Sequence, residues 1–167
     1  MKTLRTLLIL NLMLLTVGCY FGNVPPKVDY DYNVNADFSR LKTYNWNSEP
    51  GGIEFNQLAV YRIKKAVNAQ LQSKGLSLSS NSPDFFIVMY GARITQYDLT
   101  WRGYDSKLYY DQGILKLAFY DAQSNDLLWW GQTRADLFFG LTPEEENTIV
   151  DQTVQEVLSK FPPVSSK

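Results

Sequence analysis

The chain has 167 residues, a length typical of a single domain, and its 16 basic and 17 acidic residues give a formal net charge of −1. It contains no histidine and one cysteine, which excludes Ser-His-Asp and Cys-His catalysis, histidine-ligated zinc and an intrachain disulfide. The mildly acidic balance, without any run of basic residues, argues against nucleic acid as a partner.

Residues 1–18 have the pattern of a secretory signal peptide. Lys2 and Arg5 precede an almost wholly apolar run from Leu7 to Val17, and Gly18-Cys19 ends that run. An apolar run of roughly ten residues is typical of a cleaved signal, whereas a helix that spans a membrane needs roughly twenty. We therefore expect cleavage before Cys19.

The segment around the cysteine, Leu15-Thr16-Val17-Gly18-Cys19, resembles the lipobox of bacterial lipoprotein precursors. The resemblance implies that the Cys19 thiol receives a diacylglyceryl group and that the freed amine receives a further acyl chain, which anchors the protein in a membrane. Thr16 departs from the pattern, because leucine is usual three residues before the cysteine. The alternative is ordinary cleavage nearby, which would release a soluble protein with a free Cys19.

The residue after the cysteine bears on the destination. Tyr20 stands where an aspartate typically retains a lipoprotein in the inner membrane of a Gram-negative cell. The resemblance therefore implies sorting to the outer membrane, with the domain on its periplasmic face.

The mature chain is expected to form one domain behind a lipidated tether. Residues 19–27 contain Pro25-Pro26 and lack hydrophobic periodicity, which is typical of a linker. Residues 28–163 are expected to form a single domain, and residues 164–167 a short tail.

Two strands and a helix are predicted first in this domain. Val28–Asn33 alternates with a period of two, and Thr43–Trp46 is a second short strand. A helix is predicted over 56–74, followed by Gly75 at a position typical of a helix C-terminus. The apolar residues of this helix fall on one face: Val60, Ile63, Val67 and Leu71.

Three more strands and a second helix follow. The strands are predicted at Asp84–Tyr90, Ile114–Asp121 and Leu127–Arg134, and a polar turn joins the last two as a hairpin. Thr142 and Glu145 form a capping box with Pro143 at the first helical position, so a helix is predicted to begin there. Its apolar face comprises Val150, Val154, Val157, Leu158 and Phe161, and Pro162-Pro163 ends it.

The resulting order is β-β-α-β-β-β-α. Neither helix can bury its apolar face alone, so both are expected to pack on one face of a sheet. The predicted fold is α+β, with a mainly antiparallel sheet of about five strands and two helices packed on one face.

Several short motifs, in this order and spacing, resemble those of the domain-of-unknown-function family numbered four-one-three-six, a group of Gram-negative lipoproteins. They cover nearly the whole mature chain: Val28-Asp29-Tyr30-Asp31, Ala36-Asp37-Phe38-Ser39, Thr43-Tyr44-Asn45-Trp46, Pro83-Asp84-Phe85-Phe86-Ile87-Val88, Gly113-Ile114-Leu115-Lys116-Leu117, Leu128-Trp129-Trp130-Gly131 and Phe161-Pro162-Pro163. The chain departs at Trp130, where the family more often has arginine. The resemblance implies an envelope location; the family name carries no activity or catalytic residue, so nothing else about function follows from it.

Two groups of residues are candidates for a binding role. Asp29 and Asp31 share a strand face at a spacing of about 7 Å, within reach of a divalent cation, or else they line a solvated strand edge. The segment 98–111 is predicted to be a loop rich in aromatic residues. Their side chains either contact a protein or glycan partner or cover the open face of the sheet. Its candidate contact residues are Trp101, Tyr104, Tyr109 and Tyr110.

The adjacent pair Trp129-Trp130 must point to opposite faces of its strand, so one ring is expected to lie away from the helices. The missing catalytic residue types and the aromatic segment favour a non-enzymatic binding or assembly module of the cell envelope without a cofactor. Its expected partners are the membrane and an envelope protein or cell-wall glycan. The alternatives are a structural or self-associating envelope protein, and a carboxylate-based metal binder or hydrolase.

Overall fold

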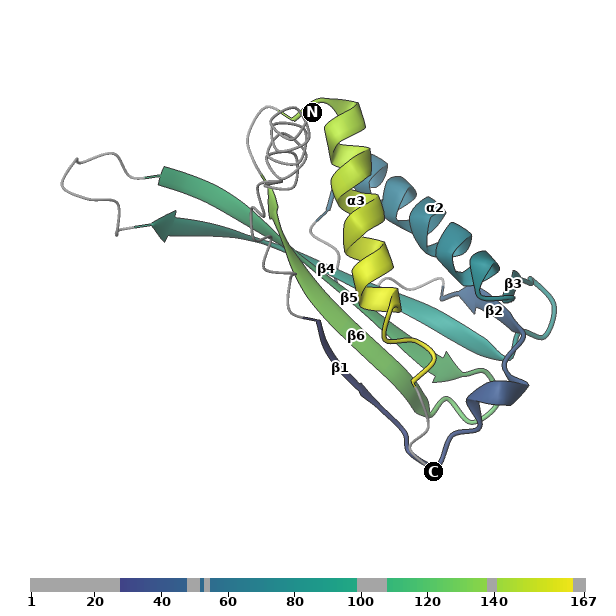
Figure 1. Cartoon of the computed structure of the whole chain (residues 1–167). Helices are drawn as coiled ribbons and strands as arrows, with labels where there is room; N and C mark the ends of the chain where they lie inside the picture. Colours follow the sequence, from purple (N-terminus) through teal and green to yellow (C-terminus); the bar gives the residue numbers. More distant parts are fainter. Residues whose placement is uncertain (1–27, 48–51, 53–54, 99–107, 138–140, 164–167) are drawn as a thin grey trace, which may run out of the picture.

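Six strands form one sheet, and two helices lie side by side on one of its faces in the computed structural model (Figure 1). The structure describes residues 28–47, 52, 55–98, 108–137 and 141–163, so the expected signal peptide, tether and tail lie outside the described residues. The elements are β1 (Asp29–Tyr32), the 3-10 turn η2 (Phe38–Arg40), β2 (Thr43–Trp46), α2 (Gln57–Ser73), β3 (Ser77–Leu78), β4 (Phe85–Asp98), β5 (Leu108–Asp121), β6 (Leu127–Leu137) and α3 (Pro143–Leu158).

The order of strands in the sheet is β1-β6-β5-β4-β2-β3. The pairs β1/β6, β6/β5 and β5/β4 are antiparallel, whereas β2 runs parallel to both β4 and β3. The predicted α+β class with two helices on one face is confirmed. The sheet is mixed, because the chain leaves β2 and crosses the sheet through α2, which returns it to the same end for β3 and β4. The sixth strand, β3, was not predicted and is two residues long.

The three central strands extend further than predicted. β4 and β5 pair over their whole length, from Phe85 opposite Asp121 to Asp98 opposite Leu108, and this hairpin reaches well beyond the helices (Figure 1). The prediction of a loop over 98–111 is therefore wrong at its C-terminal end. Tyr109 and Tyr110 belong to β5, where their backbones pair with those of Tyr97 and Gln96. Cross-strand hydrogen bonding outweighs the high polarity that suggested a loop.

The predicted glycine at the end of α2 and the predicted capping box at the start of α3 are confirmed, whereas α3 ends at Leu158, before the predicted stop at Pro162-Pro163. The side chain of Asn56 accepts a hydrogen bond from the Ala59 N–H at the start of α2. At its other end, the N–H groups of Gly75 and Leu76 donate to the carbonyls of Gln72 and Leu71, and Gly75 has a φ of +83°, a conformation that favours glycine. The Thr142–Glu145 capping box is present at the start of α3.

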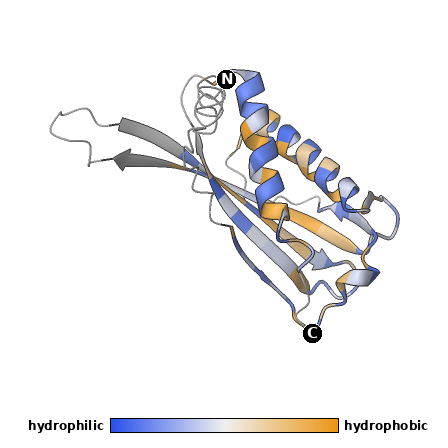
Figure 2. Cartoon of the chain, in the orientation of Figure 1, coloured by the Kyte–Doolittle hydropathy of each residue, from blue (hydrophilic) through white to orange (hydrophobic). Residues whose placement is uncertain are grey.

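The core lies between the helices and the sheet. Hydrophobic and hydrophilic residues alternate along both helices (Figure 2), and the apolar ones pack toward the sheet. An aromatic cluster joins the strands to the end of α3: the Phe119 ring lies 4.9 Å from Trp129 and 4.7 Å from Phe161, and the Trp129 and Phe161 rings are 5.4 Å apart. Such ring pairs contribute about 0.5–1.5 kcal/mol each beyond their burial. Phe161, which follows α3, therefore fastens that helix to the sheet.

Gly131 makes room for the Trp129 indole. A Cβ at Gly131 would lie 2.6 Å from Trp129 Cζ2 and 2.9 Å from Val157 Cγ2, so the ring and the helix occupy the space where a side chain would stand. The indole can therefore lie flat against the sheet because the residue two positions along the same face has no side chain.

Two carboxylates fasten the end of the sheet that carries η2. Asp84 accepts hydrogen bonds from the N–H groups of Lys42 and Thr43, both at 2.8 Å, which hold its pKa below the usual value. Asp121 accepts from the N–H groups of Ser124 at 3.0 Å and Gln123 at 2.8 Å, and it also pairs with Arg40. These partners lower the pKa of Asp121 as well.

Replacing Gly131 with alanine should lower the free energy of unfolding by about 2 kcal/mol, because the added Cβ forces Trp129 and Val157 apart in a packed core. Denaturant titration followed by circular dichroism measures the change. Gln132→Ala, one residue along and on the opposite face, is the control and should change stability by less than about 0.5 kcal/mol. Equal stability of the Gly131 variant and the wild type would contradict the packing described for Trp129.

Acid should destabilise the domain partly through Asp121. Because its folded pKa lies below the usual 3.8, the ionised carboxylate stabilises the fold above that pH, and the stabilisation is lost as the pH falls through the folded pKa. Asp121→Asn should therefore be less stable than the wild type at about pH 6, and its stability should fall less between about pH 6 and about pH 3. Denaturant titrations at the two pH values measure both effects, and an equal fall in the two proteins would contradict this role.

Candidate functional site

The sheet has a second face, opposite the two helices. Phe85, Ile87 and Met89 of β4 are buried on the helix side, so the alternate residues of each strand point the other way. We call this side the open face. Its residues in β1, β4, β5 and β6 include Asp29, Asp31, Phe86, Val88, Tyr90, Ala92, Ile114, Lys116, Ala118, Tyr120, Trp130, Gln132 and Arg134.

The side chains of the adjacent residues Trp129 and Trp130 point to opposite faces of the sheet, as predicted. Trp129 is fully buried in the aromatic cluster on the helix side, whereas Trp130 is only partly buried. Trp130 lies opposite Ala118 of β5 and Asp31 of β1, which places all three residues on the open face.

Lys116 lies at the centre of the open face between two aromatic rings. Its Nζ is 4.6 Å from the centre of the Trp130 ring and 5.7 Å from that of Tyr90. Tyr90, Lys116, Gln132 and Asp29 are direct cross-strand neighbours and form one row across four strands. Cation–π attraction of about 0.5–1 kcal/mol per ring holds the ammonium group in place while leaving its hydrogen-bond donors available.

Two tyrosines cover the middle of the open face. Tyr120 and Tyr90 are joined by a side-chain hydrogen bond, which together with burial raises the pKa of Tyr120. The row that contains Val88 and Ala118 lies between these two residues, so the tyrosine side chains reach across it. Ala118 is only 1% exposed although both helices are on the other side of the sheet. The aromatic rings of Tyr90 and Tyr120 therefore cover the middle of the open face.

The two candidate carboxylates lie at the edge of this face. Asp31 is opposite Trp130 and accepts a hydrogen bond from the N–H of Tyr32 at 2.8 Å, and Asp29 is opposite Gln132. Within the described ranges, no group of three or more aspartate, glutamate, histidine or cysteine side chains is placed to hold a metal ion. The structure thus brings the aspartates to the aromatic surface and not to a third acidic ligand.

Of the remaining residues predicted to form a site, some lie outside the described part of the chain and others lie within it. Cys19, Trp101 and Tyr104 lie outside the described residues. The backbones of Tyr109 and Tyr110 lie in the extended part of β5. The sequence did not predict the involvement of Lys116, Tyr90 and Tyr120. The signal available for them was the alternation in the two strand segments, which places all three on one face.

No helix in the described part of the chain combines the length and the apolar character needed to cross a membrane.

Comparisons with solved structures show the fold alone. A PDZ domain protein from Parabacteroides distasonis is similar with a TM-score of 0.56 at 15% identity, over 84% of this chain and 36% of that one. This chain therefore spans about a third of that protein. The PelC dodecamer from Paraburkholderia phytofirmans has a TM-score of 0.54 at 10% identity, over 80% of this chain and 96% of that one. No curated protein matches the sequence.

A family model described as a domain of unknown function, DUF4136, matches residues 28–163. The match covers the whole domain from β1 to the residues after α3, as the motifs along the sequence implied. The chain therefore belongs to the DUF4136 family.

Proposed function

We propose that the chain is a lipid-anchored protein of the Gram-negative envelope whose domain binds a cell-wall glycan on the open face of the sheet and catalyses no reaction. The main support for the proposal is the position of Lys116 between the aromatic rings of Tyr90 and Trp130, on the face opposite both helices. Sugar rings have apolar C–H faces and polar edges, so a surface of aromatic rings beside hydrogen-bonding groups is complementary to them.

The polarity of the open face favours a glycan over a protein partner. The cores of protein interfaces are depleted of charged residues, whereas the centre of the open face holds Lys116 with Gln132 and Asp29 in the same row. The ammonium group can pair with a carboxylate of the ligand, and the aspartate and glutamine can bond its hydroxyl or amide groups. A carboxylate-bearing cell-wall glycan provides all of these partners.

The residue types support a role in binding. The whole sequence has no histidine, and its one cysteine is the expected lipid attachment site, so the commonest nucleophile and base pairs cannot be assembled. The carboxylates Asp29 and Asp31, which could serve a hydrolase, lie beside the rings of the open face, where they also suit hydrogen bonds to sugar hydroxyl groups.

The anchor would keep the domain near the glycan. Two or three acyl chains on Cys19 make membrane attachment effectively permanent, since one chain alone binds only marginally. Residues 19–27 can span at most about 30 Å, so the domain would stay close to the membrane surface. Tyr20 in place of aspartate supports the outer membrane as that surface.

Replacing Trp130 with alanine should weaken binding to purified peptidoglycan sacculi by roughly five- to tenfold, because a stacking ring and the support of Lys116 are lost together. Co-sedimentation of the full chain, made with Cys19→Ser so that no acyl chain contributes, measures the bound fraction. Lys116→Met should weaken binding similarly and make it less sensitive to salt.

The matched control is Tyr61→Ala, which removes an exposed ring from α2 on the other side of the molecule and should leave sacculus binding unchanged. Equal binding by the wild type and the Trp130 variant would contradict the proposal. If the chain instead sediments as an oligomer that Trp130→Ala disrupts, the open face is a self-association surface and the glycan proposal is wrong.

Replacing Cys19 with serine should release the protein from membranes and abolish incorporation of labelled fatty acid, because the serine hydroxyl does not take the place of the thiol as lipid acceptor. Fractionation of cells by ultracentrifugation measures the first effect and metabolic labelling the second. Continued pelleting of the serine variant with outer-membrane vesicles, or labelling equal to that of the wild type, would contradict the anchor.

A further inference from the structure

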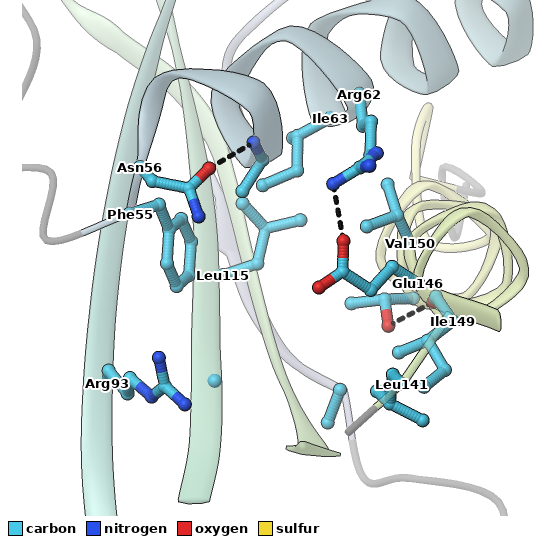
Figure 3. A pocket seen from close by; sticks show the side chains of 14 residues that line it. Phe55, Asn56, Arg62, Ile63, Arg93, Leu115, Leu141, Glu146, Ile149 and Val150 are labelled. Carbon is cyan, nitrogen blue, oxygen red and sulfur yellow. Dashed lines mark hydrogen bonds and ion pairs between the residues drawn. The ribbon is translucent and has the colours of Figure 1, made fainter. Parts of the chain in front are cut away.

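The end of the β4–β5 hairpin projects beyond both helices (Figure 1). The first turns of α2 and α3 lie over the row of Arg93, Gly113 and Ala135, and together with these residues they line a hollow of about 170 Å³ (Figure 3). β4 continues for five residues past this row to Asp98, which is about 16 Å at the rise of an extended strand. The last part of the hairpin is therefore not covered by either helix.

The expected membrane anchor joins the domain at the same end of the sheet. β1 is antiparallel to β6, and its first residue, Asp29, lies opposite Gln132. The N-terminal end of β1 therefore faces the end of β6 at Leu137, which is paired with Asp111 of the hairpin. Cys19, the expected lipid attachment site, precedes Asp29 by ten residues. The direction of β1 thus favours an anchor on the side of the domain to which the hairpin projects.

The length of the projecting hairpin matches the reach of the expected tether. Asp29 lies in the same row as Tyr90, and the eight residues from Tyr90 to Asp98 extend about 26 Å. The ten residues from Cys19 to Asp29 can span at most about 35 Å, and a flexible chain of that length spans on the order of 17 Å. An anchored Cys19 can therefore reach a membrane at the end of the hairpin, and a relaxed tether would draw the hairpin onto it.

The end of the hairpin is rich in aromatic residues. Its last four cross-strand pairs join residues 95–98 to residues 108–111. Three of these eight residues are tyrosines: Tyr97, Tyr109 and Tyr110. Tyrosine is enriched where membranes meet water, because its ring is apolar and its hydroxyl group stays hydrated. Asp98 and Asp111 belong to the same pairs, so the composition favours contact with a zwitterionic lipid surface over attraction to an anionic one.

We propose that the end of the β4–β5 hairpin rests on the lipid surface to which Cys19 is anchored. This inference rests on the proposed anchor, because the tether makes the contact intramolecular. A weak contact then suffices, since a short flexible linker gives an effective concentration in the millimolar range. The hairpin acts as a spacer that holds Lys116, which lies in the row of Tyr90, up to about 26 Å from the lipid. The open face stays accessible to a glycan.

The test couples the mature chain, which begins at Cys19, to phosphatidylcholine vesicles that contain a maleimide lipid. The sequence has one cysteine, so its thiol fixes the point of attachment. Hydrogen exchange with mass spectrometry compares the coupled protein with protein whose thiol is blocked. Coupling should slow exchange of the backbone amides of 95–98 and 108–111 by at least about threefold. The turn at 123–126, at the opposite end of the sheet, should exchange at the same rate in both.

The double variant Tyr109→Ser with Tyr110→Ser should lose this slowing, because two of the aromatic rings are absent. The matched control, Tyr30→Ser with Leu127→Ser, removes two exposed apolar side chains elsewhere on the sheet and should keep the slowing. Circular dichroism shows whether each variant is folded, and the comparison of coupled and blocked wild type decides the matter if the tyrosine variant does not fold.

Exchange at the hairpin that coupling leaves unchanged, or slowing at 123–126 in its place, would overturn the proposal. Slowing that disappears when the coupled protein is diluted within the vesicles would also overturn it, because the contact would then be with a second copy. Slowing of the same size in the tyrosine variant would do so as well. Because the lipid is attached chemically, these outcomes do not depend on acylation in cells, which fatty-acid labelling measures separately.

Discussion

The structure depends on the packing of α3 and the residues after it against β5 and β6. Phe161 reaches back from the end of the helix to the rings of Phe119 and Trp129, and the Val154, Val157 and Leu158 side chains are fully buried beside them. α2 packs against α3, and the side chain of its Asn68 accepts hydrogen bonds from Tyr44 and Trp46 of β2 at 3.0 Å each. Both helices are thereby held on the same side of the sheet, and the other side receives neither.

The residues Trp129, Trp130 and Gly131 connect this packing to the proposed function. Trp129 contributes to the core, Gly131 leaves space for its ring, and Trp130 necessarily points the opposite way and lies beside Lys116. The requirement for a buried indole therefore also determines where a ring becomes available for binding.

Features that depend on neighbouring residues could be predicted from the sequence. The capping box at Thr142, the glycine after α2 and the opposite directions of the two tryptophans each follow from local geometry. The length of β4 could not be predicted, because Gly91 suggests the end of a strand until the Phe55 ring is known to lie above it. The parallel pairing of β2 with β4 depends on the path of the helix between them, which residue periodicity does not specify.

The candidate sites were harder to predict than the elements. The position of Lys116 between Tyr90 and Trp130 depends on the register of three strands, including the irregularity between Phe119 and Tyr120. The hollow between α2, α3 and the strands β4, β5 and β6 requires five elements at once, and no sequence motif marks it. By contrast, the lipid attachment at Cys19 is suggested by the sequence alone, because the signal is a contiguous pattern recognised before folding.

One face of the sheet is covered by helices, and we propose that the other is available to a ligand. Hydroxyl-radical footprinting with mass spectrometry tests it most directly, because Trp129 and Trp130 are adjacent, chemically identical and on opposite faces. We expect rapid oxidation of Trp130, slow oxidation of Trp129, and protection of Trp130 alone when glycan is added. Equal oxidation of the two side chains in the free protein, or faster oxidation of Trp129, would contradict it.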